Sequence, residues 1–159
     1  MKNNRYTLRV LSQLLSYPDA ALRAQLPQLM PVLQEEGALS AGRQAELQTL
    51  AAHLQRLDSM DAESRYVETF DRGRATCLHL FEHVHGDSRD RGPAMIDLTK
   101  TYEQSGLFLS PDELPDHLCV VLEFASTQTP EVAKAFLGEM AHILNAIFSA
   151  LLKRESPYA

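Results

Sequence analysis

Apolar side chains recur along most of the chain at the three- and four-residue spacing of an α-helix. Leu8, Leu11 and Leu15 form one such stripe, and Pro18 follows it as a stop. No segment alternates apolar and polar residues over the length of a strand, and no Asn-Gly or Asp-Gly pair marks a hairpin turn. The pattern predicts an all-α protein with helices over residues 5–16, 19–34, 40–57, 61–70, 76–85, 93–104, 115–124 and 131–152.

Proline and glycine divide these helices. Pro27 is expected to break or restart the second helix, Gly37 to end it, and Ser40 to cap the third. The last segment, residues 131–152, carries the clearest apolar stripe and predicts one continuous helix. Because of the proline breaks, we expect an irregular helical bundle.

Length and composition fit a single domain spanning residues 1–159. The chain has 159 residues, of which 45% are hydrophobic, and this is enough for one core. No run reaches the roughly 18 apolar residues of a membrane span, and the polar N-terminus is unlike a signal peptide. Cys77 and Cys119 lack metal-ligand spacing, which favours free thiols in a reducing compartment. We therefore expect a cytoplasmic protein.

The net charge of −6 is unevenly distributed along the chain. Residues 58–123 hold 14 acidic and 6 basic side chains, a local charge of −8, so the remainder sums to +2. Such a distribution repels nucleic acid and attracts a basic partner. At this point a solvated acidic surface that only keeps the protein soluble explains the charge equally well.

The segment from Tyr66 to Asp97 has the most distinctive chemistry. Two charged glycine elements, residues 71–74 (Asp-Arg-Gly-Arg) and 90–92 (Asp-Arg-Gly), flank a histidine-rich stretch. On a helix over residues 76–85, His79, Glu82 and His83 would share one face. Their H-x-x-E-H spacing occurs in a class of zinc peptidases, and a site without catalysis could add His85 or Asp87. A metal-binding or metal-dependent hydrolytic protein using His79 and His83 is therefore the alternative function.

Two further interpretations apply to the same segment. In the first, Asp71, Arg72, Asp90 and Arg91 pair with one another and connect the two loops. In the second, the helices form a groove whose acidic rim receives a basic amphipathic helix. No phosphate-binding loop, dinucleotide-binding motif or nucleophile elbow occurs in the sequence.

Three stretches of the sequence combine residues that rarely occur together. They are residues 66–74 (YVETFDRGR), 80–92 (LFEHVHGDSRDRG) and 113–118 (ELPDHL). These stretches closely resemble the nitrate reductase delta-subunit chaperones, which belong to the wider group of redox-enzyme maturation chaperones. The resemblance covers nearly the whole chain and implies one all-helical domain with no catalytic activity.

The resemblance also implies a partner and a role in anaerobic nitrate respiration. Chaperones of this family bind the N-terminal segment of the catalytic alpha subunit of the membrane-bound nitrate reductase, expected to be a basic amphipathic helix. They hold the apoenzyme in the cytoplasm while iron–sulfur clusters and the molybdenum cofactor are inserted, and they delay its docking on the membrane subunit. Proteins of molybdenum cofactor biosynthesis are a second class of partner to consider. The chain itself is expected to hold no cofactor or metal stoichiometrically, to bind no nucleic acid and not to insert into a membrane.

The client groove is expected to be centred on residues 66–103. Its aromatic or apolar contacts are predicted to be Tyr66, Phe70 and Tyr102. Its polar rim is predicted to consist of Glu82, His83, Asp87, Asp97 and Glu103, whose carboxylates would pair with client Arg or Lys side chains. The loops that shape the groove are predicted to be held by Asp71, Arg72, Asp90 and Arg91.

The sequence departs from the family pattern at two places. Members usually continue past the position of Ala159 with another helical stretch and a polar tail. Cys77 stands where a small hydroxyl residue is expected in relatives, which argues against a thiol function.

Overall fold

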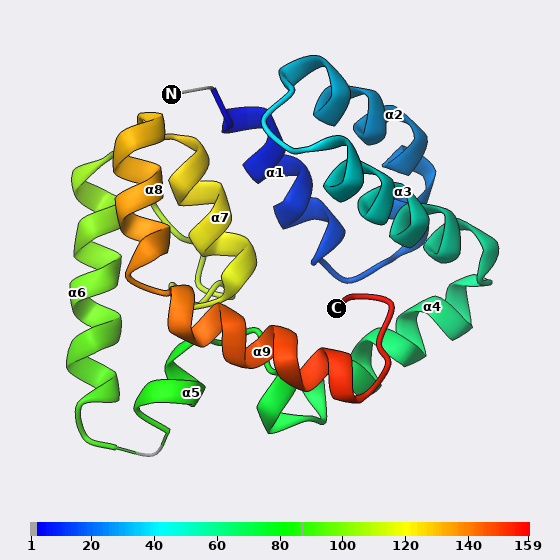
Figure 1. Cartoon of the computed structure of the whole chain (residues 1–159). Coiled ribbons are helices and arrows are strands. Elements are labelled where there is room, and N and C mark those ends of the chain that lie inside the picture. Colours follow the sequence, from blue (N-terminus) through cyan, green and yellow to red (C-terminus); the bar gives the residue numbers. More distant parts are fainter. Residues whose placement is uncertain (1–2, 87) are drawn as a thin grey trace.

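The computed structural model describes residues 3–86 and 88–159, and these form a bundle of helices (Figure 1). The longer helices are α1 (Arg5–Leu14), α2 (Ala20–Glu36), α3 (Ala41–Arg56), α4 (Ser59–Tyr66), α6 (Arg91–Gln104), α7 (Leu118–Ser126), α8 (Pro130–Gly138) and α9 (Ala141–Lys153). Between α4 and α6 lie a π-helical turn (Val67–Asp71), a 3-10 turn (Arg74–Thr76) and the one-turn helix α5 (Phe81–Val84). In the described residues the only β pairing is an isolated bridge between His79 and His117, so the all-α class is confirmed.

Polar residues fix where several helices begin. In each case a side-chain acceptor receives an N–H of the first turn, which satisfies a donor that the helix itself leaves free. The residues that cap in this way include Asp19, Ser40, Asp58 and Thr129. The predicted cap at Ser40 is confirmed, as is the end of α2 at Gly37, which adopts φ +63°. A residue without a side chain reaches this left-handed conformation at little energetic cost.

The helices pack in two groups around α1 and α7, which contact each other along the middle of the molecule (Figure 1). On one side α2 and α3 cover α1 and bury Leu26, Leu33 and Leu54 against it. On the other side α6 and α8 lie next to α7, and Tyr102 and Phe124 pack there at a ring distance of 4.7 Å. A further cluster joins α1, α4, α7, α8 and α9. α9 crosses the bundle at one end, and α4 lies at the edge farthest from α6.

The expected break at Pro27 is wrong, because α2 continues through both Pro27 and Pro31. The two prolines stand four residues apart and are exposed, so they share the outer face of the helix. Each removes one backbone hydrogen bond on that face, and the carbonyl left free there can bind water. Leu22, Leu26 and Leu33 remain buried on the inner face and hold the helix together.

The continuous helix expected over residues 131–152 is also wrong, since the segment divides into α8 and α9 with a bend of 66°. Gly138 at the end of α8 lowers the cost of interrupting the helix. The bend lets Ala133 on α8 and Ile147 on α9 enter the same core cluster. No single helix among the described residues is long and apolar enough to cross a membrane; only this bent pair reaches that length and composition.

The helix expected over residues 76–85 shrinks to the single turn of α5. The backbone from Leu78 to Leu80 pairs instead with the segment before α7: Leu80 N–H donates to the Asp116 carbonyl (3.0 Å), and Leu118 N–H donates to the Leu78 carbonyl (2.9 Å). A backbone group that bonds across to another segment cannot bond along a helix. His79 therefore precedes α5, and it does not share a helix face with Glu82 and His83.

Candidate functional site

The pairing of residues 78–80 with residues 116–118 forms a junction built around Asp116. Its side chain is completely buried, and its Oδ2 accepts the Phe81 N–H at 3.0 Å. This bond caps the start of α5 from a distant part of the chain. The carboxylate thus connects α5 to the loop before α7.

Two histidines complete the junction. His79 Nδ1 lies 3.8 Å from Asp116 Oδ1, and the His79 and His117 rings meet edge to face at 4.8 Å. Burial by itself would raise the pKa of Asp116, but His79 and the Phe81 N–H stabilise the carboxylate and hold this pKa below its ordinary value. The pKa of His117 is lowered, mainly by burial and then by the charge of His79.

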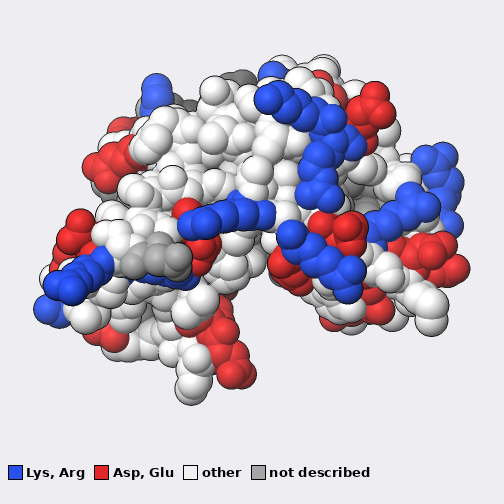
Figure 2. All heavy atoms as spheres, turned by 90° about the horizontal axis from the view of Figure 1, so that it is seen from below, with Lys and Arg blue, Asp and Glu red and all other residues white. Residues whose placement is uncertain are grey.

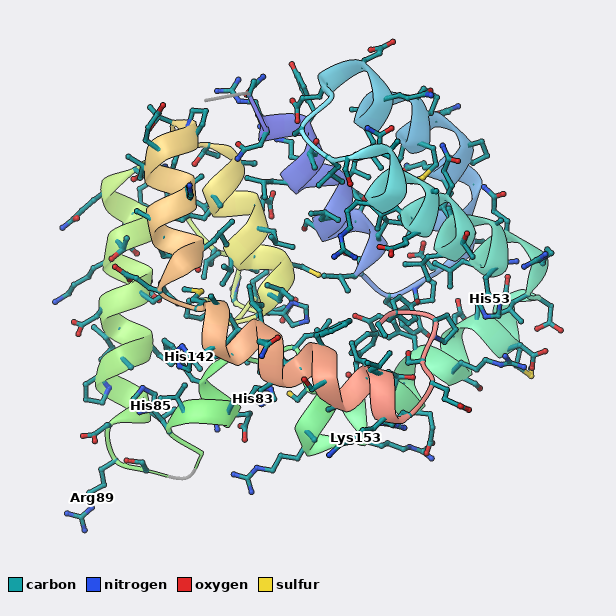
Figure 3. All side chains as sticks on the ribbon, viewed as in Figure 1. His53, His83, His85, Arg89, His142 and Lys153 are labelled. Atoms are coloured by element: carbon teal, nitrogen blue, oxygen red, sulfur yellow. The ribbon has the colours of Figure 1, made fainter. Side chains whose placement is uncertain are left out.

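The other predicted histidines face different partners. A ring nitrogen of His83, Nε2, lies 2.8 Å from the Cys77 carbonyl oxygen, and His85 stacks edge to face on Phe81 at 5.3 Å. His83 lies on α5 and His85 directly follows it, whereas His142 lies on α9 (Figure 3). Within residues 3–86 and 88–159 no three His, Cys, Asp or Glu side chains are grouped as metal ligands. The peptidase-like spacing required His79, Glu82 and His83 to share one helix face. Because His79 precedes α5, the structure does not provide that face.

The predicted pairing of Asp71, Arg72, Asp90 and Arg91 with one another is wrong. Arg91 instead forms an ion pair with Glu82, and it also lies 3.4 Å from the Gly86 carbonyl oxygen. Arg72 pairs with Glu68 at 3.2 Å, one helical turn before it. Among the described side chains, Asp71 and Asp90 form no ion pair. Arg91 still connects α5 to α6, whereas Asp71 is exposed at the end of the π turn.

The three predicted aromatic contacts lie in the core. Tyr66 is 6% exposed, and its hydroxyl donates to the Leu15 carbonyl at 2.6 Å. Phe70 packs on Tyr66, and Tyr102 is fully buried with its hydroxyl donating to the Pro115 carbonyl at 2.7 Å. Burial raises the pKa of both tyrosines. In this conformation Tyr102 therefore fills the core. Its contact with a client stays a prediction.

The predicted acidic residues do not surround one groove. Asp97 and Glu103 are exposed on α6, at the opposite edge of the bundle from α4 (Figure 1). Glu82 is engaged by Arg91, and Asp87 lies outside the described residues. On the face seen in Figure 2, Lys and Arg side chains stand beside Asp and Glu side chains. The acidic part of the sequence therefore does not fold into one uniform acidic field.

Some of the predicted residues, among them Phe70, Asp71 and Glu82, do come together beside the π turn. Three adjoining hollows lie along α4 and this turn. The first, of about 200 Å³, is lined by Leu54, Leu57, Ala62, Arg65, Glu68, Thr69 and the C-terminal residues. The second, of about 540 Å³, is lined by Tyr17, Met60, Glu63, Val67, Glu68 and Arg72. The third, of about 300 Å³, is lined by Phe70, Asp71, Arg72, Arg74, Cys77, His79 and Glu82. Glu68 borders the first two, and Arg72 borders the last two, so the hollows form a row.

We name residues 58–72, which carry this row, the α4 surface. It holds five acidic residues (Asp58, Asp61, Glu63, Glu68 and Asp71) and two basic ones (Arg65 and Arg72), a sum of −3. The five carboxylates are exposed or half-buried. In the π turn, Arg72 N–H donates to the Val67 carbonyl at 3.1 Å, one residue farther back than in an α-helix. Such turns widen a helix locally and are frequent at functional sites.

The residues that close the α4 surface at one end were not among the predicted site residues. Arg154, just after α9, donates from Nη1 to Thr76 Oγ1 (3.0 Å) and from Nη2 to the Glu68 carbonyl (3.2 Å). A Cβ at Gly73 would lie 2.6 Å from this guanidinium, so the absence of a side chain there permits the contact. Long-range contacts of this kind carry no periodic signal in a sequence.

Comparison with known proteins assigns the fold and the family. The nitrate reductase delta subunit family model matches residues 36–159. The NarJ nitrate reductase molybdenum cofactor assembly chaperone of Escherichia coli K12 is 44% identical over 152 residues, which cover 96% of this chain and 64% of that protein. A Bacillus subtilis protein, assigned as a chaperone of the same kind, is 35% identical over 99% of this chain and 84% of its own length. This chain belongs to the nitrate reductase delta subunit family.

A solved structure supports the fold independently. A crystal structure from Archaeoglobus fulgidus, of a chain assigned as a redox enzyme maturation protein, aligns with a TM-score of 0.61 and 20% identity. The alignment covers 95% of this chain and 91% of that one. At this identity the likeness concerns the helical architecture alone.

Proposed function

We propose that this protein is a maturation chaperone for a respiratory nitrate reductase. In the cytoplasm it would bind the N-terminal segment of the catalytic alpha subunit, hold the apoenzyme while iron–sulfur clusters and the molybdenum cofactor are inserted, and delay membrane docking. Family membership supports this proposal, as do the names of the Escherichia coli and Bacillus subtilis relatives. Both are named as assembly chaperones, so we propose no catalytic activity and no resident cofactor.

The row of hollows along the α4 surface is the observation that supports a binding site most directly. An amphipathic helix binds by laying apolar side chains one turn apart into successive pockets. The row offers Leu54, Val67 and Phe70 as apolar lining in its successive hollows. The carboxylates of Glu63, Glu68 and Asp71 border the same row and suit a basic peptide.

The two kinds of contact differ in strength. Exposed charge pairs contribute only about 0–1 kcal/mol each, whereas an apolar anchor at the centre of an interface can contribute about 2 kcal/mol or more. The carboxylates should therefore act mainly on the rate of association, and the hollows on the lifetime of the complex. Both contributions are required for a client helix that is basic and amphipathic.

Calorimetry with a synthetic peptide of the client's N-terminal segment tests the proposal. We expect binding that weakens when ionic strength rises, because salt shortens the Debye length to about 8 Å near physiological conditions. A matched peptide with its apolar residues replaced by serine keeps the charge and should bind much more weakly. Equal binding of both peptides would contradict a groove, and binding of neither would reject the proposed function.

A capture experiment identifies the partner in the cell. Protein recovered from cells grown on nitrate without oxygen should carry the alpha subunit of the nitrate reductase. A client variant lacking its N-terminal segment should be lost from the eluate. Retention of that truncated client would place the contact elsewhere on the enzyme.

A further inference from the structure

The C-terminal segment of this chain folds back onto the end of the α4 surface. After α9 the backbone reverses at Glu155, which has φ +53° and is the one non-glycine residue with positive φ in the described chain. The Glu155 and Ser156 N–H groups donate to the carbonyls of Leu152 and Leu151, each at 3.0 Å. This is the hydrogen-bond pattern of a helix end that glycine usually forms, so a side chain at Glu155 holds the reversal under strain.

The reversal places the Tyr158 ring against Phe70 and Tyr66, in the wall of the first hollow of the row. The ring meets Phe70 edge to face at 4.9 Å and Tyr66 at 6.1 Å. Among the described residues, Tyr158 is also the one partly buried residue that packs against both the α1–α2–α3 cluster and the cluster that joins α1, α4, α7, α8 and α9. It thus covers the two aromatic residues, Tyr66 and Phe70, that the sequence had suggested as client contacts.

Few polar contacts hold Tyr158 in this position. Among the described residues, its N–H donates only to Ser156 Oγ (3.2 Å), and Ala159 N–H donates to the Ser156 carbonyl (3.1 Å). The Tyr158 hydroxyl is buried without a hydrogen-bond partner in the described protein, an unfavourable arrangement for a polar group. Beyond the helix-end bonds of Glu155 and Ser156, the Tyr158 ring is therefore held mainly by its apolar contacts.

The chemistry of the segment matches that of the client expected here. Arg154 donates to the Glu68 and Thr69 carbonyls, and Tyr158 packs its ring on Phe70 at the wall of the same hollow. A cation beside an aromatic ring is a combination that a basic amphipathic helix can also present. The surrounding α4 surface carries the complementary charge of −3.

We propose that the position of the Tyr158 ring, over Phe70 and Tyr66 at the wall of the first hollow, is an anchor position for an aromatic or large apolar side chain of a basic client peptide. Residues 155–159 hold this position within the same molecule and leave it when the client binds. This inference rests on the proposed function, because it assigns a position on the surface where the client peptide is proposed to bind. It adds that the free protein is partly blocked by its own chain.

The first test compares the affinity of the client peptide for the full chain and for Tyr158→Ser. If the Tyr158 ring covers Phe70 and Tyr66 in about nine molecules of ten, its removal should raise the apparent affinity about tenfold. Phe108→Ser is a matched control, because Phe108 is 72% exposed and remote from the three hollows. Tyr158→Phe keeps the ring and removes only the unpartnered hydroxyl, so its affinity should equal that of the unaltered chain or fall below it.

A fluorescent reporter follows the segment directly, even if Tyr158→Ser folds poorly. The chain contains no tryptophan, so Tyr158→Trp introduces a single emitter at this position. We expect emission typical of a buried ring in the free protein and a shift to longer wavelength on addition of the client peptide. Phe148→Trp, on the exposed side of α9, should show no such shift.

The outcomes separate this inference from the proposed function. A peptide that binds the full chain with unchanged reporter emission, or with the same affinity for Tyr158→Ser, overturns the inference and leaves the chaperone function standing. A peptide that binds neither the full chain nor Tyr158→Ser rejects both. Tighter binding to Tyr158→Ser together with the emission shift is the result expected.

Discussion

The α4 surface and the exposed side of α6 both come from the acidic part of the sequence, but they differ in backbone and in charge. Residues 58–72 sum to −3, whereas α6 carries Asp97 and Glu103 together with Arg91 and Lys100 and sums to zero. The π turn interrupts the first region and is bordered by hollows. α6 is a regular helix of 14 residues whose inner face is filled by Leu98 and Tyr102. We therefore propose the binding site where an irregular backbone and its hollows adjoin the carboxylates, and not from the carboxylates alone.

The largest effect should follow loss of the Tyr102 ring on the α6 side. Tyr102→Ala empties a fully buried position and should lower the free energy of unfolding by about 3–5 kcal/mol. Tyr102→Phe loses only the bond to the Pro115 carbonyl and should lower it by about 1 kcal/mol. Urea denaturation measures both values.

The same variants test whether α6 takes part in binding. The folded Tyr102→Phe protein should bind the client peptide as the unaltered chain does, because the hydroxyl faces the core. A tenfold loss of affinity in a folded Tyr102→Phe protein would mean that α6 contributes to client binding.

Charge removal should distinguish the two regions next. The combined change Glu63→Gln, Glu68→Gln and Asp71→Asn should lower peptide affinity about tenfold at low salt, since three exposed pairs together contribute about 1–2 kcal/mol. The pair Asp97→Asn and Glu103→Gln should change it less than about twofold.

Glu139→Gln serves as a control for net charge, since Glu139 is exposed at the bend between α8 and α9. Calorimetry at two salt concentrations provides the measurement. Equal losses for the α4 and α6 variants would mean that the client senses the net charge of the molecule and not one surface.

The comparison also shows what the sequence could and could not predict. Periodicity identified the helices around α1, α3, α6 and α7, because their buried leucines recur at helical spacing. It failed at residues 76–85, whose backbone pairs with the segment around Asp116, since periodicity describes side chains and not distant hydrogen-bond partners. It also failed at Pro27, because a proline on the exposed face is tolerated in a helix whose opposite face is buried in the core.

The candidate site was harder to predict than the fold. Helical periodicity places Tyr66 and Tyr102 on apolar faces, but the same pattern describes a groove wall and a core. Arg91 was expected to pair with an aspartate in the other charged glycine element, and it pairs with Glu82 because α5 ends beside the start of α6. The contacts of Arg154 and Tyr158 with the α4 surface join residues that lie more than 80 positions apart, as with Arg154 and Thr69 at a separation of 85.

A smaller effect, confined to acidic pH, should come from His117 in the junction beside the α4 surface. Burial and then the charge of His79 lower the pKa of His117 below its ordinary 6.5, so the unfolded chain takes up a proton more readily than the folded one. The stabilising contribution of neutral His117 is complete above pH 6.5 and is lost as the pH falls through the lowered pKa.

His117→Asn keeps an acceptor for the Cys119 N–H while removing the titrating ring. Its free energy of unfolding should therefore fall less between pH 7 and pH 5.5 than that of the unaltered chain. Urea denaturation at both pH values gives the difference. Parallel changes in the two proteins would show that His117 does not titrate in this range.

The smallest effect should come from Arg72, and it bears on the comparison most specifically. Arg72 and Glu68 are both largely exposed and lie one turn apart, so Arg72→Gln should lower the free energy of unfolding by less than about 0.5 kcal/mol. The same change frees the Glu68 carboxylate and makes the α4 surface more negative, which should raise the association rate of a cationic client peptide about twofold at low salt. Because this attraction is screened, the gain should disappear as ionic strength rises. Lys100→Gln makes an equal change in net charge on α6, and stopped-flow association rates compare the two variants directly. An equal acceleration by Lys100→Gln would mean that the client is attracted by the whole molecule, and it would remove the charge argument that separates the α4 surface from α6.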